Sequence, residues 1–149
     1  MMKVCLYQPD IPQNVGAMMR LCACLGVPLD VIGPCGFVWD EKKIRQAGMD
    51  YVDKVTLTRH SSWQQFIASN PDVRIILMTT KTDTPYTAFE FQDGDILLAG
   101  RESAGVPDDI HDAAHARIAI TMQNDLRSLN IVNATAMILG EALRQTGNT

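Results

Sequence analysis

The chain has 149 residues, of which 46% are hydrophobic and 20% charged, and a formal net charge of −4. This length and composition predict a single globular domain over residues 1–149. The acidic balance argues against nucleic-acid binding driven by overall charge, while a local basic surface stays compatible with it. The apolar runs are shorter than the ~18 residues of a membrane span, and the N-terminus does not resemble a signal peptide, so we expect a cytoplasmic protein.

Strand and helix patterns alternate about six times along the chain. The predicted strands are short apolar runs: Lys3–Gln8, Leu29–Ile32, Val52–Thr58, Val73–Met78, Asp95–Ala99 and Arg117–Thr121. The predicted helices are marked by caps, apolar spacing or stop signals: Asn14 as N-cap to Gly26, Glu41–Ala47, Ser61 or Ser62 to Asn70, Pro107–Ala113, and a long helix from Asn130. Residues 83–91 are expected to form a loop or an edge segment.

Apolar strands that alternate with helices indicate an α/β fold, with a mostly parallel sheet and helices on both faces. In such sheets, ligands bind at the carboxyl ends of the strands. Three loops fall at such ends: Thr79–Lys81, Gly100–Pro107 and Met122–Asn130. These loops are therefore the first candidates for a site.

The start of the last helix carries more polar side chains than a helix cap requires. Arg127, Ser128, Asn130 and Asn133 lie within seven residues, although one side chain suffices as a cap. The surplus indicates a binding or catalytic site.

The segment Gly100–Pro107 contains two glycines and a carboxylate directly after a buried strand. Its glycines allow a close approach of a ligand, but a tight strand-to-helix turn accounts for them equally well. The segment matches neither the dinucleotide fingerprint nor the phosphate loop, and Ser103 lacks the frame of a hydrolase nucleophile.

The first predicted helix contains Asn14, Gly16 and Arg20 in the pattern N-x-G-x-x-x-R. Glycine is a poor helix former. Its presence in the first turn has two alternative explanations. Another backbone or a ligand approaches Gly16 closely, or the helix tolerates the glycine as a defect.

The cysteines and histidines do not form a metal-binding pattern. Cys5 and Cys22 lie among apolar residues, and Cys22 and Cys24 have C-x-C spacing, so we expect reduced thiols and no metal. Three histidines lie on predicted surface segments, where we expect them to be solvated: His60, His111 and His115.

Three motifs occur in order: N-x-G-x-x-x-R (Asn14–Arg20), G-R-E-x-x-G-V-P (Gly100–Pro107) and R-S-L-N-x-x-N (Arg127–Asn133). With them the chain resembles the SPOUT-class RNA 2′-O-methyltransferases over nearly its whole length. It is most similar to the small tRNA (cytidine/uridine-34)-2′-O-methyltransferases, which lack a separate RNA-binding domain. Arg101 stands where many relatives have proline, which alters the stiffness of the loop or adds a phosphate contact.

The resemblance implies a SPOUT fold, in which the C-terminal segment threads through a loop and forms a trefoil knot. It implies S-adenosylmethionine bound within the knot, at these positions: Met78, Gly100, Ile120, Ser128 and Leu129. It also implies a homodimer with the knot helices at the interface. The apolar face of the last helix then has a second partner besides its own sheet, through Ala134, Met137, Ile138 and Leu139.

The implied reaction is methyl transfer to the ribose 2′-hydroxyl of the wobble nucleotide in the tRNA anticodon stem-loop, without a metal. By resemblance, Arg20 is the catalytic candidate, and four residues shape the site: Asn14, Glu102, Ser128 and Asn130. An arginine is a poor base because its pKa lies above ~12. We therefore expect Arg20 to clamp the adjacent phosphate and orient the hydroxyl.

Two alternatives remain. A SPOUT methyltransferase acting on another tRNA position or on rRNA would carry the same motifs. A noncatalytic RNA- or cofactor-binding module would be expected to lose Arg20 or Asn130, and this chain keeps both.

Overall fold

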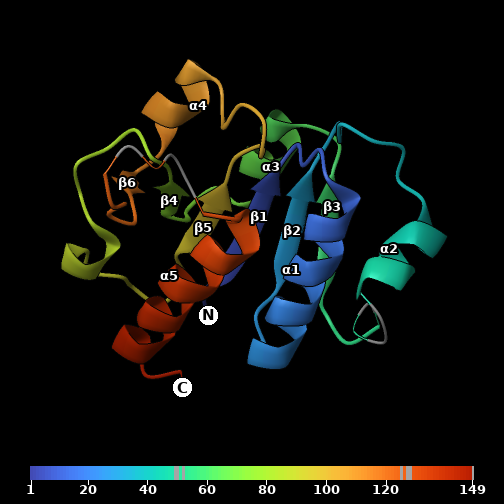
Figure 1. Ribbon diagram of the computed structural model, residues 1–149, viewed down its shortest axis with the longest axis horizontal. Coiled ribbons are helices and arrows are strands. Elements are labelled where there is room, and N and C mark those ends of the chain that lie inside the picture. Colours follow the sequence, from blue (N-terminus) through green and yellow to red (C-terminus); the bar gives the residue numbers. More distant parts are fainter. Residues whose placement is uncertain (49–50, 52, 125, 127–128, 149) are drawn as a thin grey trace.

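The computed structural model describes residues 1–48, 51, 53–124, 126 and 129–148. Its centre is a six-stranded, entirely parallel sheet in the order β3-β2-β1-β5-β4-β6 (Figure 1). The strands span these residues: β1 Lys3–Tyr7, β2 Leu29–Ile32, β3 Leu57–His60, β4 Ile75–Met78, β5 Ile96–Ala99 and β6 Ala116–Ile118. The predicted α/β class and the parallel sheet are confirmed.

Helices cover both faces of the sheet, as the sequence predicts. Their bounds are α1 Pro12–Leu25, α2 Glu41–Gly48, α3 Trp63–Ser69, α4 Asp108–Ala113 and α5 Ile131–Thr146, with a short 3-10 helix η2 at Tyr86–Ala88. One core cluster joins the sheet to α1, α2 and α5, and the other joins it to α3 and α4. Figure 1 shows α1 and α5 side by side in front of the sheet.

The two central strands are the point where the chain reverses its direction across the sheet. Strand β1 pairs with β5, and their following helices, α1 and α4, pack on opposite faces. At such a reversal of strand order, parallel sheets bind ligands beside the carboxyl ends of the strands.

The predicted cap of α1 is wrong. The helix begins at Pro12 with Ile11 as its N-cap, and no side chain caps it. Proline is favoured at the first helical position because its missing N–H has no partner to lose there. Asn14 therefore lies inside the first turn, and its side chain is available for other contacts.

Several strand ends differ from the prediction. The first strand stops at Tyr7 because Gln8 has a positive φ of 42°. The third covers Leu57–His60 instead of Val52–Thr58, because a turn bonded from Lys54 N–H to Tyr51 C=O precedes it. The last covers Ala116–Ile118, and Ala119 forms only an isolated bridge to Pro85.

The expectation of a solvated His60 is also wrong. This histidine is 7% exposed, and its Nε2 lies 2.8 Å from Oδ2 of Asp30, which is 1% exposed. Lys3 donates to the same oxygen at 3.5 Å. The polar group lies under α3, where the His60 ring meets Phe66 edge-on. Alternation along β2 and β3 places these side chains on one face of the sheet.

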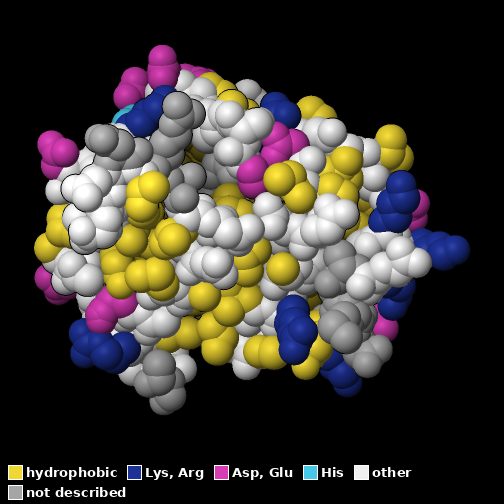
Figure 2. Space-filling model, viewed as in Figure 1, with side chains coloured by type: hydrophobic (Ala, Val, Ile, Leu, Met, Phe, Trp, Pro, Cys, Tyr) yellow, Lys and Arg dark blue, Asp and Glu magenta, His cyan; other side chains and the backbone are white. Residues whose placement is uncertain are grey.

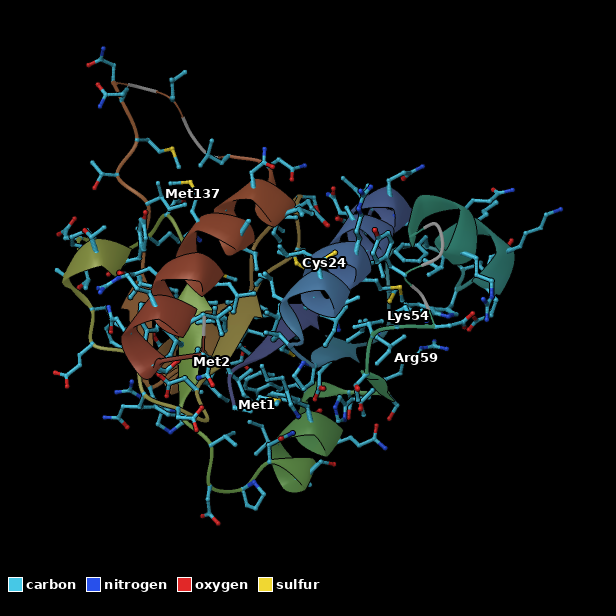
Figure 3. All side chains as sticks on the ribbon, turned by 90° about the horizontal axis from the view of Figure 1, so that it is seen from below. Met1, Met2, Cys24, Lys54, Arg59 and Met137 are labelled. Atoms are coloured by element: carbon cyan, nitrogen blue, oxygen red, sulfur yellow. The ribbon has the colours of Figure 1, made fainter. Side chains whose placement is uncertain are left out.

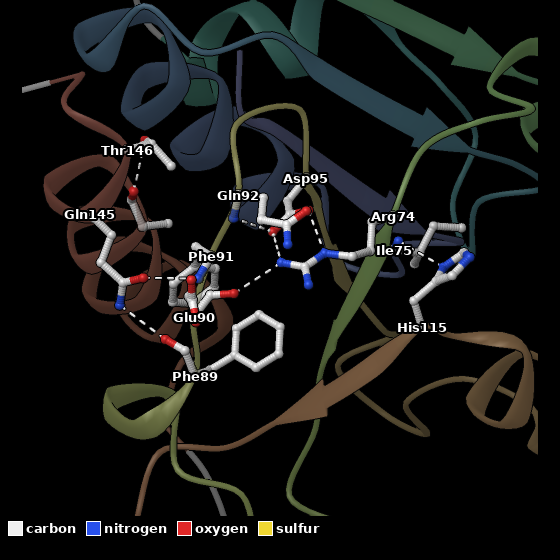
Figure 4. A network of polar contacts seen from close by, with 11 residues as sticks. Arg74, Ile75, Phe89, Glu90, Phe91, Gln92, Asp95, His115, Gln145 and Thr146 are labelled. Atoms are coloured by element: carbon white, nitrogen blue, oxygen red, sulfur yellow. Dashed lines mark hydrogen bonds and ion pairs between the residues drawn. The ribbon is translucent and has the colours of Figure 1, made fainter.

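A polar network anchors the C-terminal end of α5 to the segment before β5 (Figure 4). Gln145 accepts from the Phe91 N–H at 2.8 Å and donates to the Phe89 carbonyl at 3.0 Å. Arg74 binds the buried carboxylate of Asp95 with two hydrogen bonds of 2.8 and 2.6 Å. The far end of α5 is thereby held, which positions its N-terminus at the carboxyl edge of the sheet.

The four cysteines are free, as predicted, and Cys5 and Cys22 are buried. Across the described ranges, no helix combines the length and apolar character of a membrane span. The same residues contain no group of three or more His, Cys, Asp or Glu side chains that could hold a metal ion.

Candidate functional site

A pocket of about 550 Å³ lies over the carboxyl ends of β4, β5 and β6. Described residues of all three loops predicted at strand ends line it, including Thr79, Glu102 and Met122. The N-terminal half of α5 closes another side through Ile131, Thr135 and others. A volume of this size is typical of small-molecule sites.

Four of the five predicted cofactor positions line this pocket: Met78, Gly100, Ile120 and Leu129. The fifth, Ser128, lies outside the described residues, as does Arg127 of the same motif. Leu129 is 40% exposed at the wall of the pocket. A ligand in the pocket would cover it.

Gly100 is required by its own loop. A Cβ on it would lie 2.6 Å from the carbonyl carbon of Gly105. Two backbone hydrogen bonds close the turn, between Arg101 and Gly105, at 2.9 and 2.8 Å. Gly105 has a φ of +66°, in the left-handed region that glycine adopts without strain. The segment Gly100–Pro107 was interpreted either as a ligand site or as a tight turn. It is a tight turn, and the same turn lines the pocket.

Three predicted catalytic residues meet at the mouth of this pocket. The amide of Asn14 donates to Oε1 of Glu102 at 3.3 Å and accepts from the amide of Asn130 at 3.3 Å. Asn130 also caps α5, because its side-chain oxygen accepts from the N–H groups of Val132 and Asn133. Instead of capping α1, the side chain of Asn14 joins this helix to the loop after β5 and to the start of α5.

Asp10 is a member of the site that the sequence reasoning missed. Its N–H donates to Oε2 of Glu102 at 3.1 Å, and its carboxylate accepts from the hydroxyl of Ser103. The side-chain hydrogen bond with Glu102 lowers the pKa of Asp10. Burial, followed by the same contact, raises the pKa of Glu102. The pair thus favours a proton on Glu102 over Asp10. An acidic residue in the loop after the central strand β1 was the available signal.

Arg20 lies apart from these three residues on α1. It follows Asn14 by six residues, which is roughly 9 Å along a helix and about two-thirds of a turn away in direction. It is exposed, and its guanidinium lies 5.1 Å from the ring centroid of Tyr51. The structure therefore brings together Asn14, Glu102 and Asn130, and places Arg20 on a different side of the same helix.

Two nitrogen atoms at the pocket have unmet hydrogen-bonding capacity. Within the described part of the chain, Nε2 of His111 and Nε of Arg101 are buried without a hydrogen-bond partner. Both residues line the pocket, whose remaining walls include apolar side chains of Met78, Ile118 and others. Apolar walls with a few polar groups suit a nucleoside-like ligand, and the carboxylate of Glu102 suits a positive charge on it.

Comparisons with known proteins agree with this geometry. A model of the SpoU rRNA Methylase family matches residues 1–140. A tRNA (cytidine(34)-2′-O)-methyltransferase from Beijerinckia indica is 54% identical over 144 residues, covering 95% of this chain and 90% of its own.

Two solved structures extend the match to the fold. One, described as "Structural insights into the 2-OH methylation of C/U34 on tRNA", has a TM-score of 0.91 and 36% identity, with 97% of this chain and 95% of that chain covered. The other is the SpoU methyltransferase AviRb from Streptomyces viridochromogenes in complex with AdoMet, with a TM-score of 0.84 and 26% identity, covering 97% and 60%. With a family match over nearly its full length and relatives of the same fold, the chain belongs to the SpoU rRNA Methylase family.

Proposed function

We propose that this protein is an S-adenosylmethionine-dependent tRNA methyltransferase, which methylates the ribose 2′-hydroxyl of the wobble nucleotide, cytidine or uridine 34. The observation that carries the proposal is the cluster of Asn14, Glu102 and Asn130 at the mouth of a ligand-sized pocket. The relative from Beijerinckia indica with 54% identity bears the name of that activity. A tRNA substrate also implies a cytoplasmic location.

The residues of the pocket fit the cofactor. Apolar side chains of Met78, Ile120 and Leu129 would hold its base and ribose, and Gly100 would leave its backbone accessible. The buried Nε2 of His111 would gain the partner it lacks among the described residues. By motif, Ser128 joins this set. When bound, S-adenosylmethionine supplies a methyl group on a positively charged sulfur.

The side chains around the pocket then orient the RNA. Asn14 is fixed from both sides by Glu102 and Asn130, so its amide is a rigid positioning group. Such rigidity matters because the hydroxyl must reach ~3–3.5 Å from the methyl group. Arg20, roughly 9 Å along α1 from Asn14, would hold a neighbouring phosphate of the same RNA, as a guanidinium binds phosphate with two parallel hydrogen bonds. The hydroxyl proton leaves to phosphate or water.

We propose that the protein works as a homodimer of single-domain subunits. Figure 2 shows hydrophobic side chains gathered over α1 and α5 on one face of the molecule. Met137 on α5 is 44% exposed and Leu25 on α1 is 42% exposed. Two residues of the predicted apolar face are buried against the subunit's own sheet, Ile138 and Leu139. The other two can contact a partner subunit: Ala134 and Met137. A second copy would cover this surface.

The C-terminal trefoil knot is part of the same proposal. Strand β6 lies at the edge of the sheet beside β4, whereas α5 contacts β5 and α1 near the centre. Just after β6, Ala119 is hydrogen-bonded to Thr84 and Tyr86 of the loop after β4, so a knot would thread the C-terminal segment past this loop. The likeness in fold to SpoU methyltransferases supports this path.

The test is incubation of the protein with methyl-labelled S-adenosylmethionine and total tRNA, followed by mass mapping of the modified nucleoside. We expect label on the 2′-oxygen of nucleotide 34. Label on a base, or on no RNA, would contradict the proposal. The name of the family favours rRNA as the second candidate substrate, so rRNA is included as a parallel arm.

A further inference from the structure

One surface beside the candidate site has no role in the function proposed above. It consists of Phe37, Val38 and Trp39 in the loop between β2 and α2, together with Arg59 on β3; we call it the aromatic strip. We propose that the aromatic strip binds an unpaired nucleobase next to the methylated nucleotide, with the adjoining phosphate on Arg59. This inference deepens the proposed function and rests on it for the identity of the RNA.

The strip begins at the rim of the site. The N–H of Gly36 donates to the Pro9 carbonyl at 2.9 Å. A Cβ on Gly36 would lie 2.5 Å from Cβ of Asp10 and 3.2 Å from the guanidinium of Arg101. Asp10 in turn donates its N–H to Glu102. The loop is thus separated from the predicted catalytic carboxylate by a single residue.

Arg59 approaches the same rim from β3. Burial raises the pKa of Cys35, while Arg59 lowers it and Glu102 raises it. The loop that carries the strip is thus joined to the site through Gly36 and Asp10.

The side chains of the strip have the geometry of a stacking platform. The rings of Phe37 and Trp39 are stacked, with centroids 6.3 Å apart and planes inclined by 20°. The guanidinium of Arg59 lies 4.1 Å from the centroid of the Trp39 ring. Trp39 Nε1–H donates to Glu41 at 3.0 Å, which holds the ring in place. Both rings pack partly against the core, so little entropy is lost when a ligand stacks on them.

Exposure and charge point to RNA as the occupant. Val38, which lies between the two aromatic residues in the sequence, is 87% exposed. Residues 36–60 hold five of the 13 Lys and Arg residues of this acidic chain, against four Asp and Glu residues. Arg45 is paired with Asp53 by two hydrogen bonds of 3.0 Å, which leaves Lys42, Lys43, Lys54 and Arg59 as the cations for phosphate. Figure 2 shows Lys and Arg side chains gathered over α2, and Figure 3 places Lys54 and Arg59 on one side of the molecule.

This combination is typical of proteins that bind single-stranded nucleic acid. Aromatic faces accept any base, and neighbouring cations attract the phosphates. Sequence-specific RNA recognition also targets loops whose bases are splayed out. A second copy of the chain is the competing occupant, but a protein interface has less need of exposed lysines, which are depleted there.

The two tryptophans of the chain allow a direct test of binding. Trp39 lies in the strip, and Trp63 lies on α3 against Tyr7 and Phe66. The variants Trp63→Phe and Trp39→Phe each leave one tryptophan as a fluorescent reporter. Titration with an anticodon stem-loop RNA should quench the fluorescence of Trp63→Phe and leave that of Trp39→Phe unchanged. Equal responses of the two proteins would overturn the proposal.

Kinetics of methyl transfer give the second readout. Trp39→Ala should raise the KM for RNA roughly 5- to 100-fold, as expected for the loss of one stacked base, with the KM for S-adenosylmethionine unchanged. Arg59→Ala should weaken RNA binding and reduce its salt dependence by about one phosphate contact. Arg144→Ala removes an exposed arginine at the end of α5 and is the matched control.

The outcomes separate this inference from the proposed function. If the wild-type protein methylates nucleotide 34 and both strip variants keep its KM for RNA, only the inference fails. If no tRNA is methylated, the proposed function fails, while the fluorescence titration still reports on RNA binding. If Val38→Asp changes the oligomeric state in sedimentation and RNA quenches neither tryptophan, the strip is a contact between subunits, and the inference is wrong.

Discussion

The side-chain amide of Asn14 donates a hydrogen bond of 3.3 Å to Glu102, 88 positions further along the chain. This contact joins the first turn of α1 to the loop after β5, across the point where the sheet reverses direction. Since Asn14 also accepts from Asn130, one side chain links all three sequence motifs. The site is therefore assembled by the sheet topology, and each motif alone is incomplete.

Glu102→Gln should lower turnover while stabilising the fold at neutral pH. Glutamine cannot accept from Asn14 and from the Asp10 N–H with two oxygen atoms, so the positioning of Asn14 is lost. Burial raises the pKa of Glu102. Its contribution to stability is therefore present below the pKa of the unfolded chain and is lost as the pH rises through the raised value.

The stability gain of Glu102→Gln over the wild type should accordingly increase as the pH rises from the ordinary pKa of a glutamate, 4.5, through the raised pKa of Glu102, measured by thermal unfolding. Asp10 acts in the opposite sense: its lowered pKa contributes stability that is lost only as the pH falls through it. Glu90→Gln, at an exposed glutamate, serves as the control. A pH-independent difference between variant and wild type would rule out this account.

Arg20→Lys should reduce kcat about tenfold or more, with the KM for S-adenosylmethionine unchanged. A lysine keeps the charge but lacks the planar fork that binds a phosphate with two hydrogen bonds. Single-turnover methylation of the anticodon stem-loop measures the effect, and Arg144→Lys is the control. If the lysine variant retains most of the turnover, the phosphate-clamp role is wrong.

Met137→Glu should convert a dimer into monomers without unfolding the subunit. The side chain is 44% exposed on α5, so a carboxylate is tolerated in the monomer but not inside an apolar interface. Ile67→Glu is a matched control, because Ile67 is 38% exposed on α3, on the opposite face of the sheet. Sedimentation velocity of the two variants should show monomers for Met137→Glu and dimers for Ile67→Glu. A dimer that survives Met137→Glu places the interface elsewhere.

Asp30→Ala should lower the free energy of unfolding by about 3 kcal/mol. The substitution leaves the buried His60 without its partner at 2.8 Å and removes the acceptor of Lys3. Asp30→Asn keeps an acceptor at this position and should cost less. Urea unfolding gives both values, with the exposed Asp72→Ala as reference. Equal stability of Asp30→Ala and Asp72→Ala would show that the buried group contributes nothing.

Much of the fold follows from local patterns. Short apolar runs and the stop at Gly26 determine where strands and helices alternate, because backbone preferences act over a few residues. The ends of elements were less predictable. Asn14 has the side chain of a cap, but Pro12 started the helix earlier, and Asn14 was left for the site.

The buried pair of His60 and Asp30 was beyond a sequence argument. His60 falls just beyond the predicted strand Val52–Thr58, so it looks solvated until the neighbouring strand places a carboxylate beside it. The same holds for Asp10, whose importance depends on Glu102, 92 positions away. Such contacts depend on strand order, which local patterns do not encode.

By itself, the sequence determined the class of fold, the three ordered motifs and the loops at strand ends that line the pocket. Only the tertiary structure decided which of those residues meet: Asn14, Glu102 and Asn130 come together, while Arg20 lies on another side of α1. The physical reason is range. Hydrophobic periodicity acts between neighbouring residues, whereas a site at the carboxyl edge of a parallel sheet is created by pairing β1 with β5 across more than half of the chain.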